Sequence, residues 1–492
     1  MFSDLSPTST ALLFAAVALA LSFEFVNGFH DTANAVATVI YTHSLRPTVA
    51  VVWSGIWNLI GVLTSSGTVA FGVLALLPVE LILNVGSAAG FAMVFSLLLS
   101  AIIWNLGTWW LGLPASSSHT LIGSIMGVGL ANATLQGGSH FGEGVNWAKA
   151  SEVGLSMLVS PLIGFAAAGL LLLLMKFTIK RPELYSEPEK GKEPPLWVRS
   201  LLIFTCTGVS FAHGSNDGQK GMGLILLILI GILPGTFALN HSAGYETIHP
   251  ILINANSAEM VAVKHARSGS VNNADAAQEL SAFLKPGALV TAKTFTALTV
   301  KIAAVRTTLT DKQSVTDLDP ENRGALRSNI YLVSESIGKL LDKNQVTDPA
   351  ERTQLKSFKT SLDPLIKYIP TWVKFAVAIA LGLGTMIGWE RIVVTVGEKI
   401  GKTHLSYAQG AAAELIAATT IAAADIAGLP VSTTHVLSSA VAGTMAANHS
   451  GLQIVTLRNL LLAWVLTLPV CVFLGALLFS LGLNVIVGMG LH

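Results

Sequence analysis

Charge is scarce in this 492-residue chain. Only 12% of its residues are charged, 52% are hydrophobic and the formal net charge is +1, and the mean hydropathy is +0.64. So small a net charge provides no basic surface for nucleic acid, and we expect no nucleic-acid partner. Because a membrane span needs about 20 mostly apolar residues, the composition predicts a polytopic protein embedded in a lipid bilayer rather than a soluble one.

Cysteine is nearly absent as well. Cys206 and Cys471 both lie in apolar runs and share no metal-ligand spacing, so we expect buried thiols and no disulfide framework. The chain also lacks a basic segment ahead of its first apolar run at residues 9–27, where Asp4 is the charged residue. A secretory signal begins with a basic region. We therefore expect this run to stay in place as a helix.

One octapeptide occurs twice. The first copy is Gly-Leu-Pro-Ala-Ser-Ser-Ser-His at 112–119, and the second is Gly-Leu-Pro-Val-Ser-Thr-Thr-His at 428–435. In each copy Gly and Pro interrupt an apolar run, and three hydroxyl residues precede the next run. Pro pre-sets the first turn of a helix, and Ser or Thr caps it. Each copy therefore predicts a helix N-terminus lined with hydroxyls, which attracts an anion.

A second pair of motifs has the same spacing. The tetrapeptide that ends in Asp31 is Gly-Phe-His-Asp, and the one that ends in Asp217 is Gly-Ser-Asn-Asp. Asp31 precedes Pro114 by 83 positions, and Asp217 precedes Pro430 by 213, of which 130 belong to a polar stretch at 241–370. The halves therefore match. We expect an all-α polytopic membrane protein with two inverted-topology repeats, broken helices, hairpin-like hydroxyl-rich segments and about 10–12 transmembrane elements.

A charged linker and the polar stretch divide the chain further. We expect a first membrane repeat at 1–175, a cytoplasmic linker at 176–199, the start of the second repeat at 200–240, a helical insertion at 241–370 and the remainder of the second repeat at 371–492. Lys and Arg favour cytoplasmic membrane ends, which puts both termini and the insertion on the outer side of the membrane. The helical spacing of Asn329–Leu341 predicts a small helical hairpin in the insertion, for which we expect an accessory role.

Polar residues inside apolar runs are the functional candidates, because burying them in a membrane is costly. Asp31 and Asp217 occupy equivalent places beside glycines that permit an unwound backbone. A carboxylate beside free carbonyl groups suits a small cation or a proton. The hydroxyl triplets suit a tetrahedral oxyanion, since capping does not account for three hydroxyls at both sites. An oxyanion beside two carboxylates would be repelled unless a cation or proton intervened, which indicates ion coupling.

The candidates fall into two groups. The expected oxyanion ligands are Ser116, Ser117, Ser118, Gln219, Ser432, Thr433, Thr434 and Asn34. The expected ligands of a coupling cation or proton are Asp31, Asp217, His30 and Asn216, and the two Asp residues are also the expected metal ligands if a metal travels with the oxyanion.

Several other residues stay open to two interpretations. Lys220 either neutralises an oxygen or snorkels out of the membrane. Each intramembrane His, at 30, 119, 213 and 435, is a proton carrier or a satisfied bundle residue. The carboxylates at 24, 414 and 425 have no symmetric counterpart and are functional or simply paired. Ser118 and His119 do not form a hydrolase pair, because successive residues point apart on a helix and no Gly-x-Ser-x-Gly elbow occurs; we expect no enzyme.

At these four motifs the sequence resembles the inorganic phosphate transporter (Pit) family, and closely its bacterial low-affinity members, along nearly the whole chain except the insertion. The resemblance implies an inverted-repeat secondary transporter that binds phosphate between the two hydroxyl-rich segments and the two Asp-bearing breaks. It also implies a homodimer in the cytoplasmic membrane of a bacterium. No cofactor is implied. The transported species would be inorganic phosphate and protons, with Mg, Ca, Zn or another divalent ion if phosphate travels as a neutral metal complex.

The coupling ion depends on departures from the family pattern. Sodium-driven members commonly read Gly-Ala-Asn-Asp at both breaks, whereas here Phe29 and His30 precede the first Asp, and Gln219 and Lys220 follow the second. This pattern resembles proton symporters. We therefore expect low-affinity phosphate uptake by proton symport. The alternatives within the same class are a sodium-coupled phosphate symporter and a sulfate permease on the same scaffold. An alternative from another class is a membrane phosphate sensor or surface receptor in which the insertion is the functional part.

Overall fold

The structure is a computed structural model that describes residues 6–31, 33–74, 76, 87–135, 142, 144–189, 191, 193–266, 271–285 and 287–488. The chain divides into two compact units. The membrane unit comprises Phe14–Leu77, Phe91–Ile225 and Pro370–His492, and the insertion unit consists mainly of Leu226–Ile369. Cys206 and Cys471 are buried free thiols of the membrane unit.

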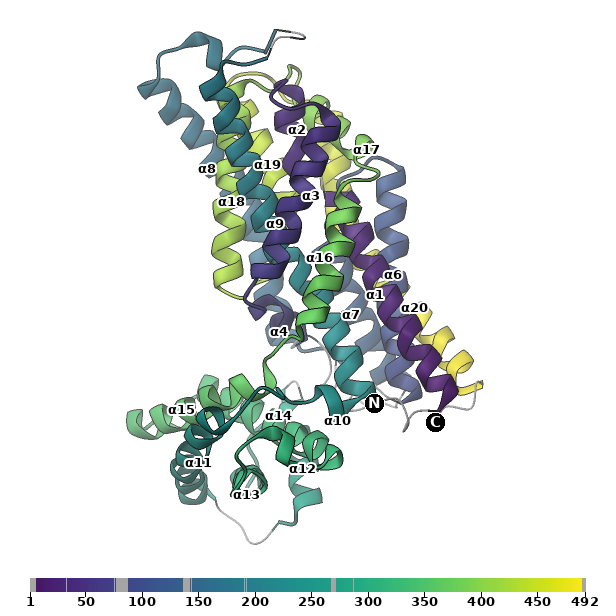
Figure 1. The fold of residues 1–492 in the computed structure, drawn as a ribbon, viewed down its shortest axis with the longest axis vertical. Coiled ribbons are helices and arrows are strands. Elements are labelled where there is room, and N and C mark those ends of the chain that lie inside the picture. Colours follow the sequence, from purple (N-terminus) through teal and green to yellow (C-terminus); the bar gives the residue numbers. More distant parts are fainter. Residues whose placement is uncertain are drawn as a thin grey trace. The chain divides into compact units, whose positions relative to one another are not determined.

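The first half of the chain up to the linker forms a series of helices (Figure 1). They are α1 (Pro7–Asp31), α2 (Ala33–Tyr41), α3 (Pro47–Thr64), α4 (Thr68–Leu74), α6 (Ala88–Trp110), α7 (Ser117–Leu135) and α8 (Trp147–Thr178). After a 3-10 turn at Pro182–Leu184 follow α9 (Leu196–Ile232), α16 (Thr371–Thr385), α17 (Glu390–Glu398), α18 (Tyr407–Ile426), α19 (Thr433–Ala447) and α20 (Ile454–Gly488). Among the described residues, six helices, or seven if one bent pair counts, are long and apolar enough to cross a membrane.

The two halves pack reciprocally within the membrane unit. Helix α7 of the first half lies against α20 of the second, and α19 of the second half lies against α8 of the first. Glycines make both contacts close: a Cβ on Gly127 would lie 2.1 Å from the Val472 carbonyl oxygen, and one on Gly443 would lie 2.1 Å from the Phe165 carbonyl oxygen. Small residues let membrane helices approach in this way. Each hydroxyl-rich segment is thereby fixed to the last helix of the other half.

Both octapeptides interrupt the chain in the same manner. Gly112 and Gly428 have φ of +67° and +68°, and in each copy the next residue donates its N–H to the carbonyl five positions earlier, at 2.9 Å. This is a Schellman end, which needs the left-handed backbone that glycine adopts without cost. Pro114 and Pro430 lie in the irregular connection that follows and not, as expected, in the first turn of the next helix.

The expected break beside Asp217 is wrong. Helix α9 is continuous from Leu196 to Ile232, whereas the expected break after Asp31 lies at residue 32, outside the described residues. The glycines near Asp217 serve packing instead, because a Cβ on Gly214 would lie 2.2 Å from the Asn58 carbonyl oxygen of α3. Gly214 therefore provides a close approach between helices and leaves the backbone helical.

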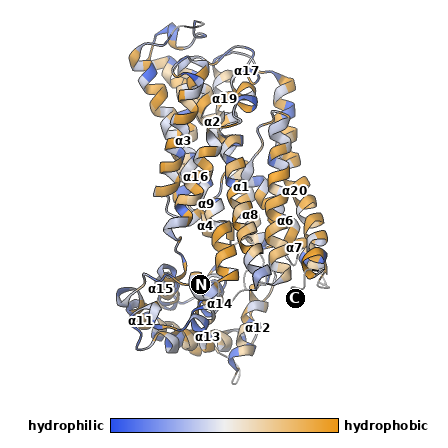
Figure 2. Ribbon diagram, turned by 45° about the vertical axis from the view of Figure 1, so that its right-hand side comes forward, coloured by the Kyte–Doolittle hydropathy of each residue, from blue (hydrophilic) through white to orange (hydrophobic). Residues whose placement is uncertain are grey.

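The insertion unit is a helical domain with its own core. It contains α10 (Pro234–Phe237), α11 (Tyr245–His265), α12 (Asn273–Leu284), α13 (Thr294–Leu309), a 3-10 turn at Val315–Asp317, α14 (Pro320–Asp342) and α15 (Pro349–Ile366). Apolar residues from α11 to α15, such as Ile248, Leu298 and Phe358, form one buried cluster. The expected small hairpin is therefore wrong, since each helix has an apolar face that needs several partners. Figure 2 shows α11–α15 as more hydrophilic than α3, α16 and α20.

Candidate functional site

The first hydroxyl of each triplet caps a helix. Ser116 and Ser432 precede α7 and α19, and their Oγ atoms accept the N–H groups of His119 at 3.2 Å and His435 at 3.1 Å. A capping hydroxyl satisfies one of the free N–H groups of the first turn. The remaining hydroxyl residues occupy the first two helical positions and are buried: Ser117, Ser118, Thr433 and Thr434.

Asp31 connects the two hydroxyl-rich segments. Ser117 Oγ donates to its Oδ2 at 3.1 Å, and Thr434 Oγ1 donates to its Oδ1. His30 Nδ1 lies 3.4 Å from the same Oδ1, and His30 Nε2 lies 3.1 Å from Thr108 Oγ1. Asp31 is 2% exposed. Hydroxyls that the sequence assigns to an oxyanion thus bind a carboxylate in this structure.

Asp217 is paired with Lys220 one turn further along α9. Lys220 Nζ lies 2.7 Å from Asp217 Oδ1 and donates to Ser118 Oγ at 2.5 Å. Ser118 Oγ in turn donates to the Val431 carbonyl oxygen at 2.7 Å, which links α7 to the second hydroxyl-rich segment. Lys220 is 0% exposed. Of its two interpretations, snorkelling is therefore excluded, and the ammonium belongs to the polar cluster.

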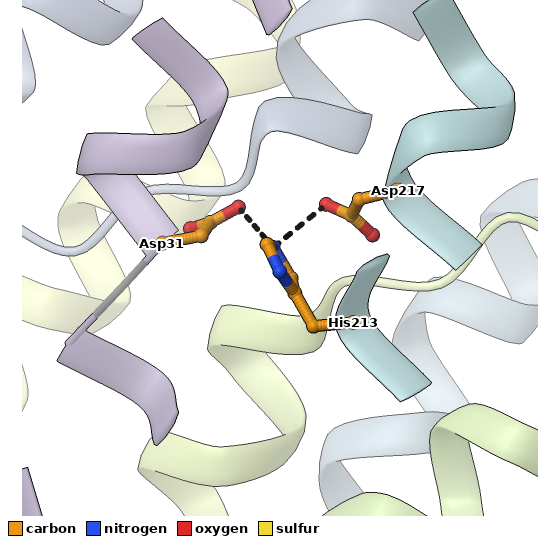
Figure 3. Close-up of side chains that lie close together, drawn as sticks. All are labelled: Asp31, His213 and Asp217. Carbon is orange, nitrogen blue, oxygen red and sulfur yellow. Dashed lines mark ion pairs between the residues drawn. The ribbon is translucent and has the colours of Figure 1, made fainter. Parts of the chain in front are cut away.

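His213 lies between the two carboxylates (Figure 3). Its Nε2 is 3.8 Å from Asp31 Oδ2 and 3.5 Å from Asp217 Oδ2. Its Nδ1 is 2.6 Å from Asn58 Oδ1, which orients the ring. One ligand atom from each of Asp31, His213 and Asp217 lies within 4.8 Å of the others, so this group could hold a metal ion. The residues of both Asp motifs thus form a single buried site.

Gln219 and Asn216 hold neighbouring elements together. Gln219 Nε2 donates to Asp425 Oδ1 at 2.5 Å, and its Oε1 accepts the N–H of Val69 in α4 at 2.9 Å. Asn216 Nδ2 donates to the Leu429 carbonyl oxygen at 3.2 Å. Asp425 is therefore a paired carboxylate. Ligand roles for Gln219 and Asn216 stay predictions, and the Asn34 side chain lies outside the described residues.

The histidines of the octapeptides form a separate group. The rings of His119 and His435 are 4.7 Å apart, and His435 stacks on Trp464 at 4.0 Å. Both histidines line a cavity of about 710 Å³ whose other walls are mostly apolar residues of α7, α8, α19 and α20. The walls of this cavity include neither Asp31, Asp217 nor Lys220.

Glu414 is a further buried carboxylate, and the sequence analysis missed its partners. Glu414 Oε2 accepts from Thr205 Oγ1 at 2.5 Å, and its Oε1 accepts from Thr38 Oγ1. Threonines in apolar helices usually bond their own backbone, so no local signal singles these two out. Glu24 is also buried, and a Cβ on Gly221 would lie 2.2 Å from its Cγ.

Comparison with known proteins identifies the family. Residues 27–475 match the sequence profile of the phosphate transporter family. The chain belongs to the phosphate transporter family. Family membership makes the protein a transporter rather than an enzyme, and it confirms the resemblance carried by the four motifs.

Individual relatives agree with the family match over nearly full length. The low-affinity inorganic phosphate transporter PitA of Escherichia coli K12 is 44% identical, covering 98% of this chain and 99% of its own. The probable low-affinity inorganic phosphate transporter of Bacillus subtilis 168 is 28% identical over 96% of each chain. The solved structure of a sodium-dependent phosphate transporter is similar in fold, with a TM-score of 0.52 and 20% identity over 96% of this chain and 98% of its own.

Proposed function

We propose that this protein takes up inorganic phosphate with low affinity, by secondary active symport with protons. The observation that supports coupling to protons is that the hydroxyl groups of Ser117 and Thr434 both donate to Asp31. These hydroxyls lie at the two helix N-termini that are suited to bind an oxyanion. Phosphate and the Asp31 carboxylate therefore compete for the same donors.

A proton on Asp31 would remove this competition. The neutral carboxyl group needs fewer donors, so both hydroxyls could turn to phosphate oxygens. The proton also removes a like charge, and two unit charges about 4 Å apart repel by about 4 kcal/mol at an effective dielectric constant of about 20. That is about a thousandfold in affinity. Phosphate thus binds tightly only together with the proton, which is the condition for symport.

The packing of the hydroxyl-rich segments supports alternating access. Helices α7 and α19 are each fixed to the last helix of the other half, so the pairs α7–α20 and α19–α8 can rock as units about the buried site. We place the protein in the cytoplasmic membrane of a bacterium as a homodimer, with both termini and the insertion in the periplasm.

The test is uptake of radioactive phosphate into proteoliposomes under an imposed proton gradient, with and without sodium and magnesium. We expect uptake to require the proton gradient and to be independent of sodium. It should fall to background in Asp31→Asn, because an amide cannot bind and release a proton as a carboxylate does. Thr419→Ala is the matched control, because the Thr419 hydroxyl bonds carbonyl oxygens of its own helix, those of Leu415 at 2.9 Å and Ile416 at 3.1 Å.

Each other outcome assigns a different function. Magnesium dependence with co-uptake of the metal would mean that phosphate travels as a neutral metal complex, and Asp31, His213 and Asp217 would then receive that cargo. Sodium-dependent uptake would make the protein a sodium symporter. Stronger competition by sulfate than by phosphate would make it a sulfate permease.

A further inference from the structure

Lys220 stands where the first half of the chain has an amide. It follows Asp217 by three positions, as Asn34 follows Asp31. The two Asp motifs therefore have the same spacing but differ in charge, because the second contains the positively charged Lys220.

The surroundings of the Lys220 ammonium are those of a bound cation. Its Nζ lies between a carboxylate oxygen of Asp217 at 2.7 Å and the hydroxyl oxygen of Ser118 at 2.5 Å. It also lies at the first turn of α7, where the helix dipole disfavours positive charge. Asp217 must therefore hold it there. A carboxylate and a hydroxyl oxygen are the ligand types that a small dissociable cation would use.

We propose that the Lys220 ammonium is a tethered counter-cation that replaces a dissociable monovalent cation at Asp217. The charge at Asp217 is then neutralised permanently, and only Asp31 needs an ion from solution in each transport cycle. The predicted effect on transport rests on the proposed function, whereas the predicted cation site at Asp217 does not. It makes Lys220 the residue that frees Asp217 from sodium.

The first experiment measures ion binding without transport. The purified full-length protein and Lys220→Asn are heated in sodium chloride or in choline chloride at equal ionic strength. The Asn amide removes the ammonium and supplies an oxygen ligand beside Asp217. We expect sodium to raise the Tm of Lys220→Asn, since a ligand that binds the native state stabilises it, and to leave the wild-type Tm unchanged.

Two further variants separate a cation site from a general loss of packing. Lys220→Met removes the charge without supplying a ligand oxygen, so sodium should stabilise it less. Adding Asp217→Asn to Lys220→Asn should abolish the sodium response. Equal responses of wild type and Lys220→Asn would overturn the proposal, and so would a response that survives loss of the Asp217 carboxylate. If Lys220→Asn does not fold, Lys220→Gln undergoes the same test.

Uptake in proteoliposomes gives the functional consequence. Wild-type uptake should be the same in sodium and in choline, whereas Lys220→Asn should be faster in sodium by about 5-fold or more, a typical coupling factor between two bound ligands. Wild-type protein that takes up no phosphate would refute the proposed function and leave the thermal assay valid. Lys220→Asn that transports equally well in both salts would refute the tethered cation.

Discussion

Replacing Gly127 with Ala should weaken the contact that holds α7 in place. The added methyl group would lie 2.1 Å from the Val472 carbonyl oxygen of α20, where real Cβ atoms essentially never come within 3.0 Å. The two helices must therefore separate by about 1 Å, because backbone cannot rotate away as a flexible side chain can.

The expected magnitude is a difference between two effects. Overpacking a close contact costs about 1–3 kcal/mol, while Ala gains about 0.5–1 kcal/mol over Gly inside a helix. We expect a net destabilisation of about 1–2 kcal/mol for Gly127→Ala. The matched control is Gly154→Ala in α8, where a Cβ would meet nothing within 4 Å, and where the gain in helix propensity should remain.

Thermal unfolding of the purified variants checks the prediction. The Tm should fall for Gly127→Ala and stay level or rise for Gly154→Ala. Phosphate uptake should fall only in the first variant, because Ser117 and Ser118 begin the same helix. Equal Tm changes in the two variants would refute the reasoning, since the only difference built into the comparison is the neighbouring backbone.

Two more predictions concern buried and surface carboxylates. Thr38→Val and Thr205→Val each remove a donor from the buried Glu414 while keeping side-chain shape, so each should lower stability by about 1–3 kcal/mol, and a Tm unchanged in both would contradict this account. In the insertion unit, the hydrogen bond from His265, with a further contribution from Lys264, lowers the pKa of Glu351 below its usual 4.5. A carboxyl group whose pKa is lowered by folding stabilises the folded state fully at pH values above its unfolded-state pKa. This stabilisation is lost as the pH falls through the lower, folded-state pKa. Acid titration of the full protein should therefore show a loss of stability below about pH 4.5 that is smaller in Glu351→Gln, and identical acid profiles would show that the ion pair contributes nothing.

Glycine illustrates the limit of local sequence patterns. Gly112 and Gly214 both stand in apolar runs beside candidate site motifs. Gly112 adopts a positive φ of +67° and ends a helix, whereas Gly214 stays helical and allows the backbone of a neighbouring helix to approach closely. Nothing adjacent in sequence separates these cases, because the second depends on Asn58 in another helix.

Composition and motif spacing by themselves predicted that the protein spans a membrane, that two motifs occur twice, and that Asp31 and Asp217 hold equivalent positions in the two halves. These features depend only on the hydrophobicity of each segment and on distances along the sequence. Only the tertiary structure decided which side chains meet. Thr434 lies 403 positions from Asp31 and binds it nevertheless, and Lys220 enters the site because α9 continues without a break. Hydrophobic burial specifies which face of a helix is covered, but packing between distant helices determines the polar partners inside.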